Sequence, residues 1–303
     1  MSPHPLRWVE LTPDYRCNNR CTGCFAVRDD GPSMTDREAL DALLKGRDDG
    51  ADGLWLGGGE PTLRRDLFKL AAAARKLGYA RVKLQTNGMM LAYPEYARRC
   101  ADAGVTEVAF SIKGASAATH DRIAHAPGCY DLMVRGVENA RALGLGLEAD
   151  LMVTRSNAHE IPAMVAQNVA RGVGHFRVWM LSAVDAAQGD PAVVVEVPTM
   201  REVAPRVVEA LAHVDPDDPE ALLSLHTPPC VLPPEGQRAR FFAPSLGLRV
   251  VNPGGHAFRL EDSPIEGGHF LPGCAGCRYR PRCNGLRRDY VALHGPDEFV
   301  PVP

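Results

Sequence analysis

Short apolar runs alternate with longer amphipathic stretches over about the first 180 residues of the chain. The apolar runs span four to eight residues and carry many β-branched side chains, which is typical of buried strands. Several amphipathic stretches end at a glycine, which adopts the left-handed conformation of a helix end without a Cβ clash. We therefore expect strands at 8–11, 53–57, 81–86, 107–112, 147–154 and 176–181, and helices near 35–46, 66–77, 94–103, 130–143 and 160–171.

This regular alternation predicts an α/β fold with a parallel sheet and right-handed crossovers. Six strand–helix units fit either a doubly wound sheet or a partial barrel, whereas a complete eight-fold barrel needs about 250 residues. In both architectures ligands bind at the carboxyl ends of the strands. We therefore look for chemistry in the loops that follow the strands.

The pattern changes after about residue 190. A helix is expected at 199–213, and the polar, proline-rich stretch HVDPDDPEA follows it as a linker. The remainder is rich in Pro and Gly, and its short runs RFFAP and LRVVN predict a small hairpin. We divide the chain into a barrel at 1–190, a helix and linker at 191–224, and a small α+β domain at 225–303.

Charge and composition exclude some classes of function. The chain has 303 residues and a formal net charge of -3, so nucleic acid is not an expected partner. It contains no run of about 18 apolar residues, so no membrane association is expected. The N-terminal stretch MSPHPLRWVE lacks the apolar core of a signal peptide, which predicts a cytoplasmic protein with reduced thiols. Nine cysteines in that compartment indicate metal or redox chemistry.

Three of the cysteines, Cys17, Cys21 and Cys24, follow the first expected strand in the sequence CNNRCTGC. Their spacing matches one face of a helix, but the neighbouring Pro13 and Gly23 favour a loop. A structural zinc site normally needs four ligands, and a 4Fe-4S cluster normally takes four thiolates. Three thiolates would leave one iron of such a cluster open to an outside ligand.

Three further motifs follow later strands: GGGEP at 57–61, QTNG at 85–88 and SIKG at 111–114. Glycine lets a backbone approach a ligand closely, and Glu60 can accept hydrogen bonds from an ammonium group. Each motif is weak alone, because glycine turns are common at strand ends. Their order along the chain, behind the cysteine loop, is more specific.

The C-x3-C-x2-C loop, followed by the aromatic Phe25 and these motifs, resembles the radical S-adenosylmethionine (SAM) enzyme family over residues 7 to about 182. The resemblance implies a partial (β/α)6 TIM-like barrel. It also implies a 4Fe-4S cluster on Cys17, Cys21 and Cys24, whose open iron binds the amino and carboxylate groups of SAM. The residues that it implies for SAM binding are Phe25, Gly58, Gly59, Glu60, Pro61, Asn87, Ser111 and Lys113.

Two residues are candidates for a catalytic role. Many relatives carry Asp where this chain has Lys113, so the lysine is either a salt-bridge partner or a ligand for an anionic group of SAM or substrate. Cys129 lies in the segment after the fourth expected strand. It is either a packing or capping residue or a hydrogen-atom donor to the substrate.

The second cysteine group lies near the end of the chain. Cys274, Cys277 and Cys283 have C-x2-C-x5-C spacing, and Cys230 precedes them by 44 residues. Four thiols can form a zinc site. The spacing, behind a radical SAM core, also resembles the SPASM and shorter twitch domains, which hold auxiliary 4Fe-4S clusters. The full SPASM pattern has seven cysteines, so the resemblance implies one auxiliary cluster here.

The resemblance implies an enzyme that cleaves SAM reductively to a 5′-deoxyadenosyl radical, which abstracts hydrogen from an unactivated carbon. We expect a peptide substrate, as in ribosomal natural-product maturation, and a flavodoxin or ferredoxin-type electron donor. The alternative substrate is a small polar metabolite such as an aminocyclitol, sugar or nucleotide. A non-enzymatic iron–sulfur or zinc scaffold or sensor is a further alternative, but it would need neither GGGEP nor an open cluster ligand.

Overall fold

The structure is a computed structural model that describes residues 4–24, 31–183, 190–263 and 267–303. Its strands are β1 (Trp8–Leu11), β2 (Gly53–Leu56), β3 (Arg81–Thr86), β4 (Glu107–Ile112), β5 (Gly146–Val153), β6 (His175–Met180), β7 (Leu222–Ser224), β8 (Leu248–Val251) and β9 (Ala257–Arg259). Its α-helices are α1 (Asp36–Asp48), α2 (Leu67–Lys76), α3 (Pro94–Asp102), α4 (Ala117–Ala124), α5 (Cys129–Ala142), α6 (Ile161–Ala170), α7 (Pro191–Val194), α8 (Met200–Ala210), α9 (Ala243–Leu246) and α10 (Arg288–His294). The six expected strands and five expected helices of the first half are confirmed, with ends that differ by a few residues.

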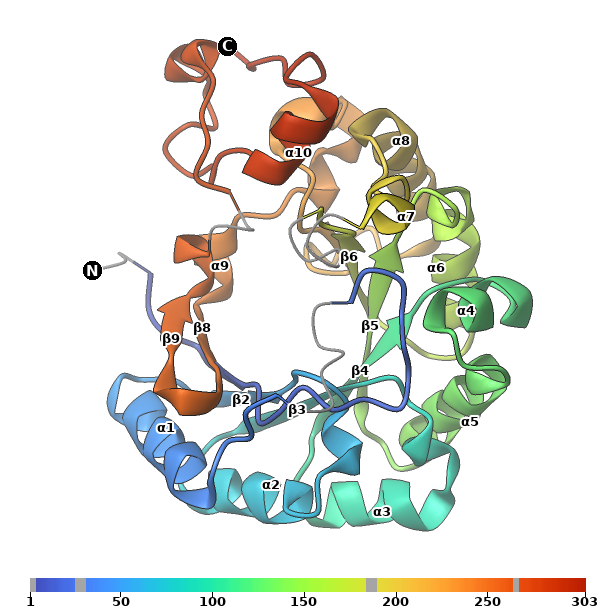
Figure 1. Cartoon of the computed structure of the whole chain (residues 1–303), viewed down its shortest axis with the longest axis vertical. Coiled ribbons are helices and arrows are strands. Elements are labelled where there is room, and N and C mark those ends of the chain that lie inside the picture. The colour runs from blue at the N-terminus through green and yellow to red at the C-terminus, as the bar shows by residue number, and fades with distance from the viewer. Residues whose placement is uncertain (1–3, 25–30, 184–189, 264–266) are drawn as a thin grey trace.

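One sheet connects all nine strands, in the order β7-β6-β5-β4-β3-β2-β1-β8-β9. Neighbouring strands run parallel, except that β9 is antiparallel to β8. The strands follow an open arc, and α1, α2, α3, α5 and α6 lie on its outer side (Figure 1). The predicted partial barrel is therefore confirmed.

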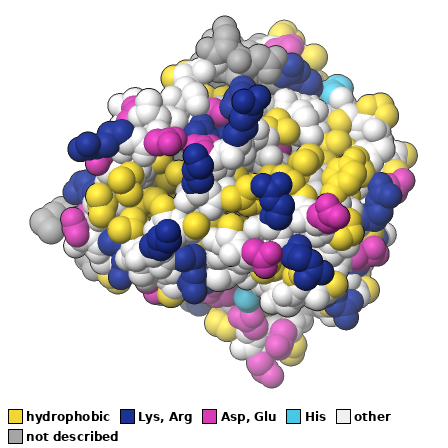
Figure 2. Space-filling model, turned by 90° about the horizontal axis from the view of Figure 1, so that it is seen from below, with side chains coloured by type: hydrophobic (Ala, Val, Ile, Leu, Met, Phe, Trp, Pro, Cys, Tyr) yellow, Lys and Arg dark blue, Asp and Glu magenta, His cyan; other side chains and the backbone are white. Residues whose placement is uncertain are grey.

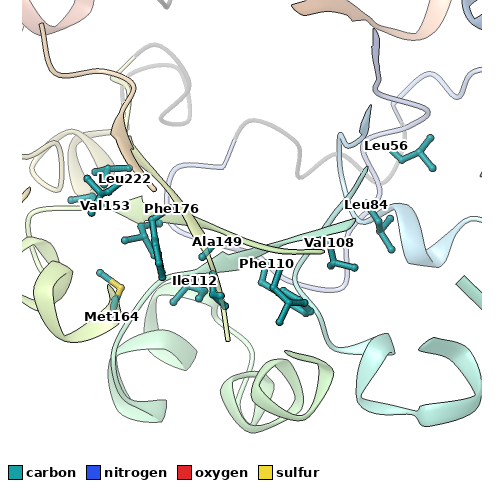
Figure 3. Close-up of a cluster of buried hydrophobic side chains, with 14 of the residues drawn as sticks. Leu56, Leu84, Val108, Phe110, Ile112, Ala149, Val153, Met164, Phe176 and Leu222 are labelled. Carbon is teal, nitrogen blue, oxygen red and sulfur yellow. The ribbon is translucent and has the colours of Figure 1, made fainter. Parts of the chain in front are cut away.

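The two faces of the strands differ in chemistry because successive side chains point to opposite sides. Apolar side chains such as Leu84, Phe110 and Ile112 point toward the outer helices and are fully buried (Figure 3). The alternate positions on the inner face are polar or charged in β3, β5 and β6. This inner face is where side chains from several strands meet.

The amino-terminal half of the inner face is filled by paired charges. Lys83 Nζ lies 2.6 Å from Glu148 Oε2, and their side chains are only 5% and 6% exposed. The same ammonium lies 4.7 Å from the ring centre of Trp8 and 4.5 Å from that of Trp55, within range of a cation–π contact. Arg81 pairs with Glu107 through two hydrogen bonds of 3.0 and 2.7 Å.

The predicted hairpin between RFFAP and LRVVN is wrong. Residues of RFFAP enter α9, whereas β8 pairs in parallel with β1, and β9 is its antiparallel neighbour. The reason is burial: Leu248 and Val250 of β8 pack with Trp8 and Trp55 at the edge of the barrel. The sheet thus crosses both expected domain boundaries, and the division at 190 and 224 stays a prediction.

A buried ion pair fastens the C-terminal segment to the end of β6. Arg287 Nη2 lies 2.5 Å from Asp289 Oδ2, and the two side chains are 3% and 4% exposed. Arg287 also donates to the carbonyl oxygen of Met180 at 3.2 Å, and Asp289 accepts from Ser182 Oγ at 3.0 Å. The segment that follows Cys283 is therefore held against the carboxyl end of a barrel strand.

Within the described ranges, no helix is long and apolar enough to cross a membrane. On the face shown in Figure 2, Lys and Arg side chains are interspersed with Asp and Glu, and apolar side chains lie between them.

Candidate active site

The loop that carries Cys17, Cys21 and Cys24 follows β1 and is held at its far end by α4. Arg20 N donates to the carbonyl oxygen of Ala124 at 3.0 Å, and Thr22 N donates to that of Ile123 at 2.9 Å. These carbonyls belong to the last turn of α4, where helix carbonyls lack partners within the helix. The cysteine loop therefore completes the end of α4, and α4 fixes the loop in return.

The glycine-rich turn after β2 holds the other end of this loop. Gly59 N donates to Asp14 O at 3.0 Å, and Glu60 N donates to Arg16 O at 2.7 Å. A Cβ at Gly59 would lie 2.2 Å from Arg16 O, and one at Gly58 would lie 2.8 Å from Asp14 O. Gly58 also has a φ of 98°, which favours glycine. The glycines therefore let the backbones of the turn and of the cysteine loop come into contact. This role is additional to the close approach to a ligand that the sequence predicts.

Glu60 connects this turn to the end of β3. Its side chain is buried, with the residue only 1% exposed. Its Oε1 accepts hydrogen bonds from Thr62 N at 3.0 Å and from Thr86 Oγ1 at 2.8 Å. Its Oε2 accepts a hydrogen bond from Asn87 N at 2.7 Å. Burial raises the pKa of Glu60, and these hydrogen bonds oppose the rise. Pro61 begins the short 3-10 helix Pro61–Leu63. A contact between Glu60 and the SAM ammonium stays a prediction.

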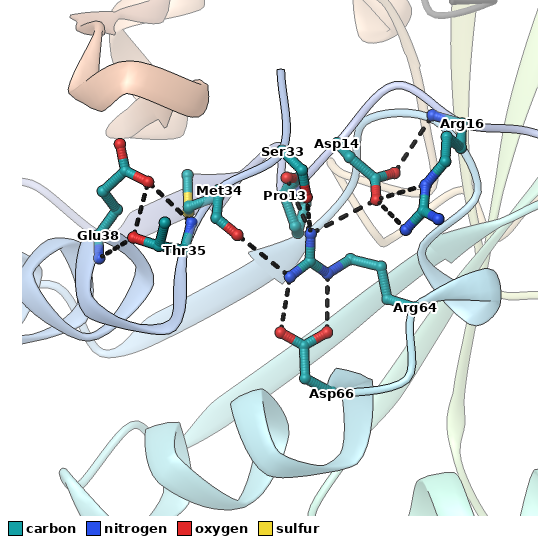
Figure 4. A network of polar contacts seen from close by, with 9 residues as sticks. All are labelled: Pro13, Asp14, Arg16, Ser33, Met34, Thr35, Glu38, Arg64 and Asp66. Atoms are coloured by element: carbon teal, nitrogen blue, oxygen red, sulfur yellow. Dashed lines mark hydrogen bonds and ion pairs between the residues drawn. The ribbon is translucent and has the colours of Figure 1, made fainter. Parts of the chain in front are cut away.

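A buried arginine that the sequence analysis missed supports the start of the cysteine loop (Figure 4). The guanidinium of Arg64 pairs with Asp66 at 2.6 Å and donates to Pro13 O at 3.0 Å and to Ser33 Oγ at 2.9 Å. It also lies 3.4 Å from Asp14 Oδ2. The RRD stretch after GGGEP gives no hint of this role, because Ser33 and Pro13 lie about 30 and 50 residues away in the sequence.

The cysteine loop fits the group that its sequence predicts. Asn19, between Cys17 and Cys21, is 1% exposed, and neither its Oδ1 nor its Nδ2 has a hydrogen-bond partner among the described residues. Such buried amide atoms are costly unless something binds them. Asn19 N also donates to Cys17 Sγ at 3.4 Å, a contact that suits a thiolate.

The three thiols lie near one another but are not gathered around a single point. Burial, followed by smaller contributions that include Glu60, Cys21 and Cys24, raises the pKa of the Cys17 thiol to about 12. In the part of the chain that the structure describes, no three Cys, His, Asp or Glu side chains surround one metal-ion position. A 4Fe-4S cluster takes its thiolates at separate irons, so spaced thiols suit it better than they suit zinc.

The remaining expected SAM contacts lie at neighbouring strand ends. Asn87 Nδ2 donates to Asn18 Oδ1 at 2.7 Å, which joins the end of β3 to the cysteine loop. Ser111 is partly buried near the end of β4, and its carbonyl oxygen lies 3.3 Å from Lys113 Nζ. Phe25 lies outside the described residues.

Lys113 is a buried cation without a carboxylate partner among the described residues. It is 4% exposed, and its ammonium donates only to Ser111 O. The neighbouring His120 is fully buried, and burial, with Lys113 as the second cause, lowers the pKa of His120 to about 3. The imidazole is therefore neutral and adds no second positive charge beside Lys113. The salt-bridge alternative for Lys113 finds no support, whereas an anionic ligand would compensate the charge.

Cys129 makes a contact of its own at the N-terminus of α5. Its thiol is 1% exposed and lies 3.3 Å from Asp121 Oδ1, which also accepts from Tyr130 N at 2.8 Å. Burial, followed by the hydrogen bond to Asp121, raises the pKa of the thiol to about 12. These contacts favour the packing and capping alternative over hydrogen-atom donation.

The four C-terminal cysteines come together as expected. Cys230, Cys274, Cys277 and Cys283 line one cavity of about 20 Å³, beside aromatic side chains such as Phe270. Burial, followed by the other three thiols among lesser causes, raises the pKa of Cys230 to about 12. Four thiols around one cavity suit a cluster better than a zinc ion, because no three of them surround a single metal-ion position in the described residues.

An inner-face group that the sequence analysis did not assemble lies at Asp150. Gln85 Nε2 donates to Asp150 Oδ2 at 2.7 Å, and Trp179 Nε1 donates to Asp150 Oδ1 at 3.0 Å. Asp150 is 3% exposed, and burial raises its pKa. These residues come from β3, β5 and β6, so only the strand register could have brought them together in a prediction.

We predict that Gly59→Ala disrupts the cysteine loop. The added Cβ would overlap Arg16 O, so the backbone pairing between the turn and the loop must open. The variant should incorporate less iron at the first site and lose the protease resistance of residues 14–24. The control is Gly174→Ala, because nothing lies within 4 Å of a Cβ there. Equal iron incorporation and protease resistance in Gly59→Ala and wild type would contradict the prediction.

Known proteins resemble this chain in sequence or in fold. The family model described as "Radical SAM superfamily" matches residues 12–165. The AdoMet-dependent heme synthase of Methanosarcina barkeri is 30% identical over 70% of this chain and 57% of its own length. The mycofactocin maturase MftC of Mycobacterium tuberculosis is 34% identical over 53% of this chain and 40% of its own length. The chain thus spans about half the length of these relatives.

The fold is also similar to that of a solved structure, Streptococcus suis SuiB bound to its precursor peptide SuiA. The TM-score is 0.65 at 15% identity, over 84% of this chain and 59% of that one. At this identity the likeness shows the fold alone. The family model covers half of the chain and contains both the cysteine loop and the glycine-rich turn. The chain therefore belongs to the radical SAM superfamily.

Proposed function

We propose that the chain is a radical SAM enzyme that modifies a peptide, as in the maturation of a ribosomal natural product. The observation that carries the enzymatic part is the cysteine loop itself. It offers three thiols and a buried amide at Asn19 that has no hydrogen-bond partner in the described part of the chain. The glycine-rich turn and α4 hold it from both ends. An iron–sulfur or zinc scaffold or sensor would need cysteine ligands, but neither the GGGEP turn nor an open cluster ligand.

The peptide part rests on similarity. One relative is a maturase, MftC, and the fold resembles that of SuiB in complex with a precursor peptide. A small polar metabolite is the second candidate, because other relatives are named as a heme synthase and a probable GTP 3',8-cyclase. Both candidates place the substrate within the barrel, near the strand ends that carry the motifs.

Family members use a 4Fe-4S cluster and SAM, which together supply a 5′-deoxyadenosyl radical. In this chain Cys17, Cys21 and Cys24 would hold that cluster. Residues of GGGEP, with Asn87 and Ser111, would contact SAM. We assign Lys113 to the SAM carboxylate, because its buried ammonium lacks a carboxylate partner within the described ranges.

We also propose that Cys230, Cys274, Cys277 and Cys283 hold one auxiliary 4Fe-4S cluster. Their common cavity and the family context support this over zinc. The Arg287–Asp289 pair ties the segment after Cys283 to the end of β6, so this site would lie beside the barrel opening. A flavodoxin or ferredoxin-type protein is the proposed electron donor.

We predict that Lys113→Met weakens SAM binding roughly ten- to hundredfold, because a hydrogen bond to a charged group is lost. The measurement is equilibrium binding of SAM to anaerobically reconstituted protein. Lys113→Arg keeps the charge and should retain most of the affinity. If the Met variant bound SAM as wild type does, Lys113 would not be a SAM ligand.

We predict that the two cysteine groups differ in function. Replacing Cys17, Cys21 and Cys24 together by Ala should abolish 5′-deoxyadenosine formation. Cys277→Ala should retain SAM cleavage but lose substrate turnover, and it should contain about four fewer irons per chain than wild type. Cys100→Ala is the matched control, because Cys100 is fully buried in the barrel core, away from both groups.

Circular dichroism and a melting curve must accompany these assays, because loss of a cluster can unfold the segment around it. If the wild type contained zinc and only one cluster's worth of iron, the auxiliary-cluster proposal would fail while the radical SAM assignment remained. A folded Cys277→Ala protein with normal substrate turnover would show that the auxiliary site is dispensable.

A further inference from the structure

Asp150 lies on the inner face of the barrel, between the two ends of β5. A cavity of about 70 Å³ at the amino-terminal half of the barrel is lined by Lys83, Glu148 and Arg177, among others. Gln85, Asp150 and Trp179 lie two residues further along the same strands, β3, β5 and β6. They therefore share the inner face with the cavity residues but lie closer to the carboxyl ends, where the family's motifs are.

The charged side chains near the amino-terminal end of this face form ion pairs with one another or with neighbouring acids. Lys83 pairs with Glu148 at 2.6 Å, and Arg81 pairs with Glu107 at 2.7 Å. Arg177 lies 3.7 Å from a carboxylate oxygen of Glu220. Lys83, whose charge also acts on Asp150, is therefore already engaged with Glu148.

Asp150 itself has no cation as a partner within the described ranges. Its two hydrogen bonds come from the amide of Gln85 and the indole of Trp179, both neutral donors. Each carboxylate oxygen accepts one of them and retains a lone pair. Burying a carboxylate without a counter-charge is costly, which is consistent with the raised pKa of Asp150.

On the β4 side, small side chains lie next to Asp150. Ser111 and Asp150 are partners in the register of β4 and β5, and Ala109 precedes Ser111 by one inward position. A Cβ at Gly57 would lie 3.0 Å from both Gln85 Oε1 and Glu10 Oε1. Glycine thus lets the Glu10 carboxylate approach the Gln85 amide, and a second acid lies near the same amide that holds Asp150.

We propose that Asp150 anchors a positively charged nitrogen of the substrate, an ammonium or a guanidinium group. This inference rests on the proposed function and adds the charge of the substrate to it. A cation would supply the missing counter-charge, and its N–H groups could fill the free lone pairs with charge-assisted hydrogen bonds. Gln85 and Trp179 are positioning residues that fix both carboxylate oxygens.

The same chemistry has two sources, a basic peptide side chain and an amino group of a small metabolite. N-acetyl-lysine amide is the probe for the first, with N-acetyl-norleucine amide as its neutral analogue. An aminocyclitol, 1-amino-1-deoxy-scyllo-inositol, is the probe for the second, with scyllo-inositol as its neutral analogue. Each is titrated into anaerobic protein that contains its clusters and SAM.

Wild type should bind at least one cationic probe roughly ten- to hundredfold more tightly than its neutral analogue. Asp150→Asn should lose that preference, and the probe that binds identifies the source. Asparagine has the same shape, and the Gln85 amide can turn over to accept from it. Glu209→Gln, which removes an acid whose side chain is 49% exposed on α8, should behave as wild type.

No preference for either cation in wild type, or an equal preference in Asp150→Asn, would overturn the proposal. The comparison within wild type holds even if the variant fails to fold. SAM cleavage to 5′-deoxyadenosine is measured on the same samples. Its absence in wild type would refute the proposed function, whereas normal cleavage without cation selectivity would refute only the role of Asp150.

Discussion

Two backbones touch where the glycine-rich turn after β2 meets the loop after β1, and the candidate active site depends on that contact. Gly59 and Glu60 donate to the carbonyls of Asp14 and Arg16, and no side chain fits between them. A loop of polar residues has little apolar surface to hold it in place, so it needs such fixed points. Glu60 extends the contact to β3, and Arg64 extends it to the segment before α1.

The chemistry of the barrel differs between its outer and inner faces, and it changes along the strands of the inner face. Its outer face is apolar and packs against helices, which contributes most of the burial. Its inner face has ion pairs at the amino-terminal end and, as far as the described residues show, charges without an oppositely charged partner near the carboxyl ends. Asp150 and Lys113 are two such charges of opposite sign. Buried charges without partners are costly to the fold and mark positions that serve ligands.

The sequence predicted most of the barrel because its signal is local. Apolar runs and glycine stops lie within ten or fifteen residues, and the strand ends at the motifs agree with the structure. Cys230 and the last three cysteines, which the resemblance to twitch domains grouped as one ligand set, line one cavity. What failed was non-local: β8 joins β1 across most of the chain, where a local hairpin had been expected.

The same limit applies to the site. Asn19 looked like any polar loop residue, and only its burial reveals two amide atoms without partners. Arg64 looked like a surface arginine, although its side chain is 8% exposed. Asp150, Gln85 and Trp179 come from three strands, and no spacing rule connects them. Register and depth had to be known before these residues could be recognised as neighbours.

We infer that the cysteine loop, held in this way, presents a cluster with an open iron to SAM. Electron paramagnetic resonance of the reduced, reconstituted protein, recorded with and without SAM, tests it most directly. We predict that SAM changes the signal of the cluster on Cys17, Cys21 and Cys24, and that this change persists in Cys277→Ala. Identical spectra with and without saturating SAM would contradict it.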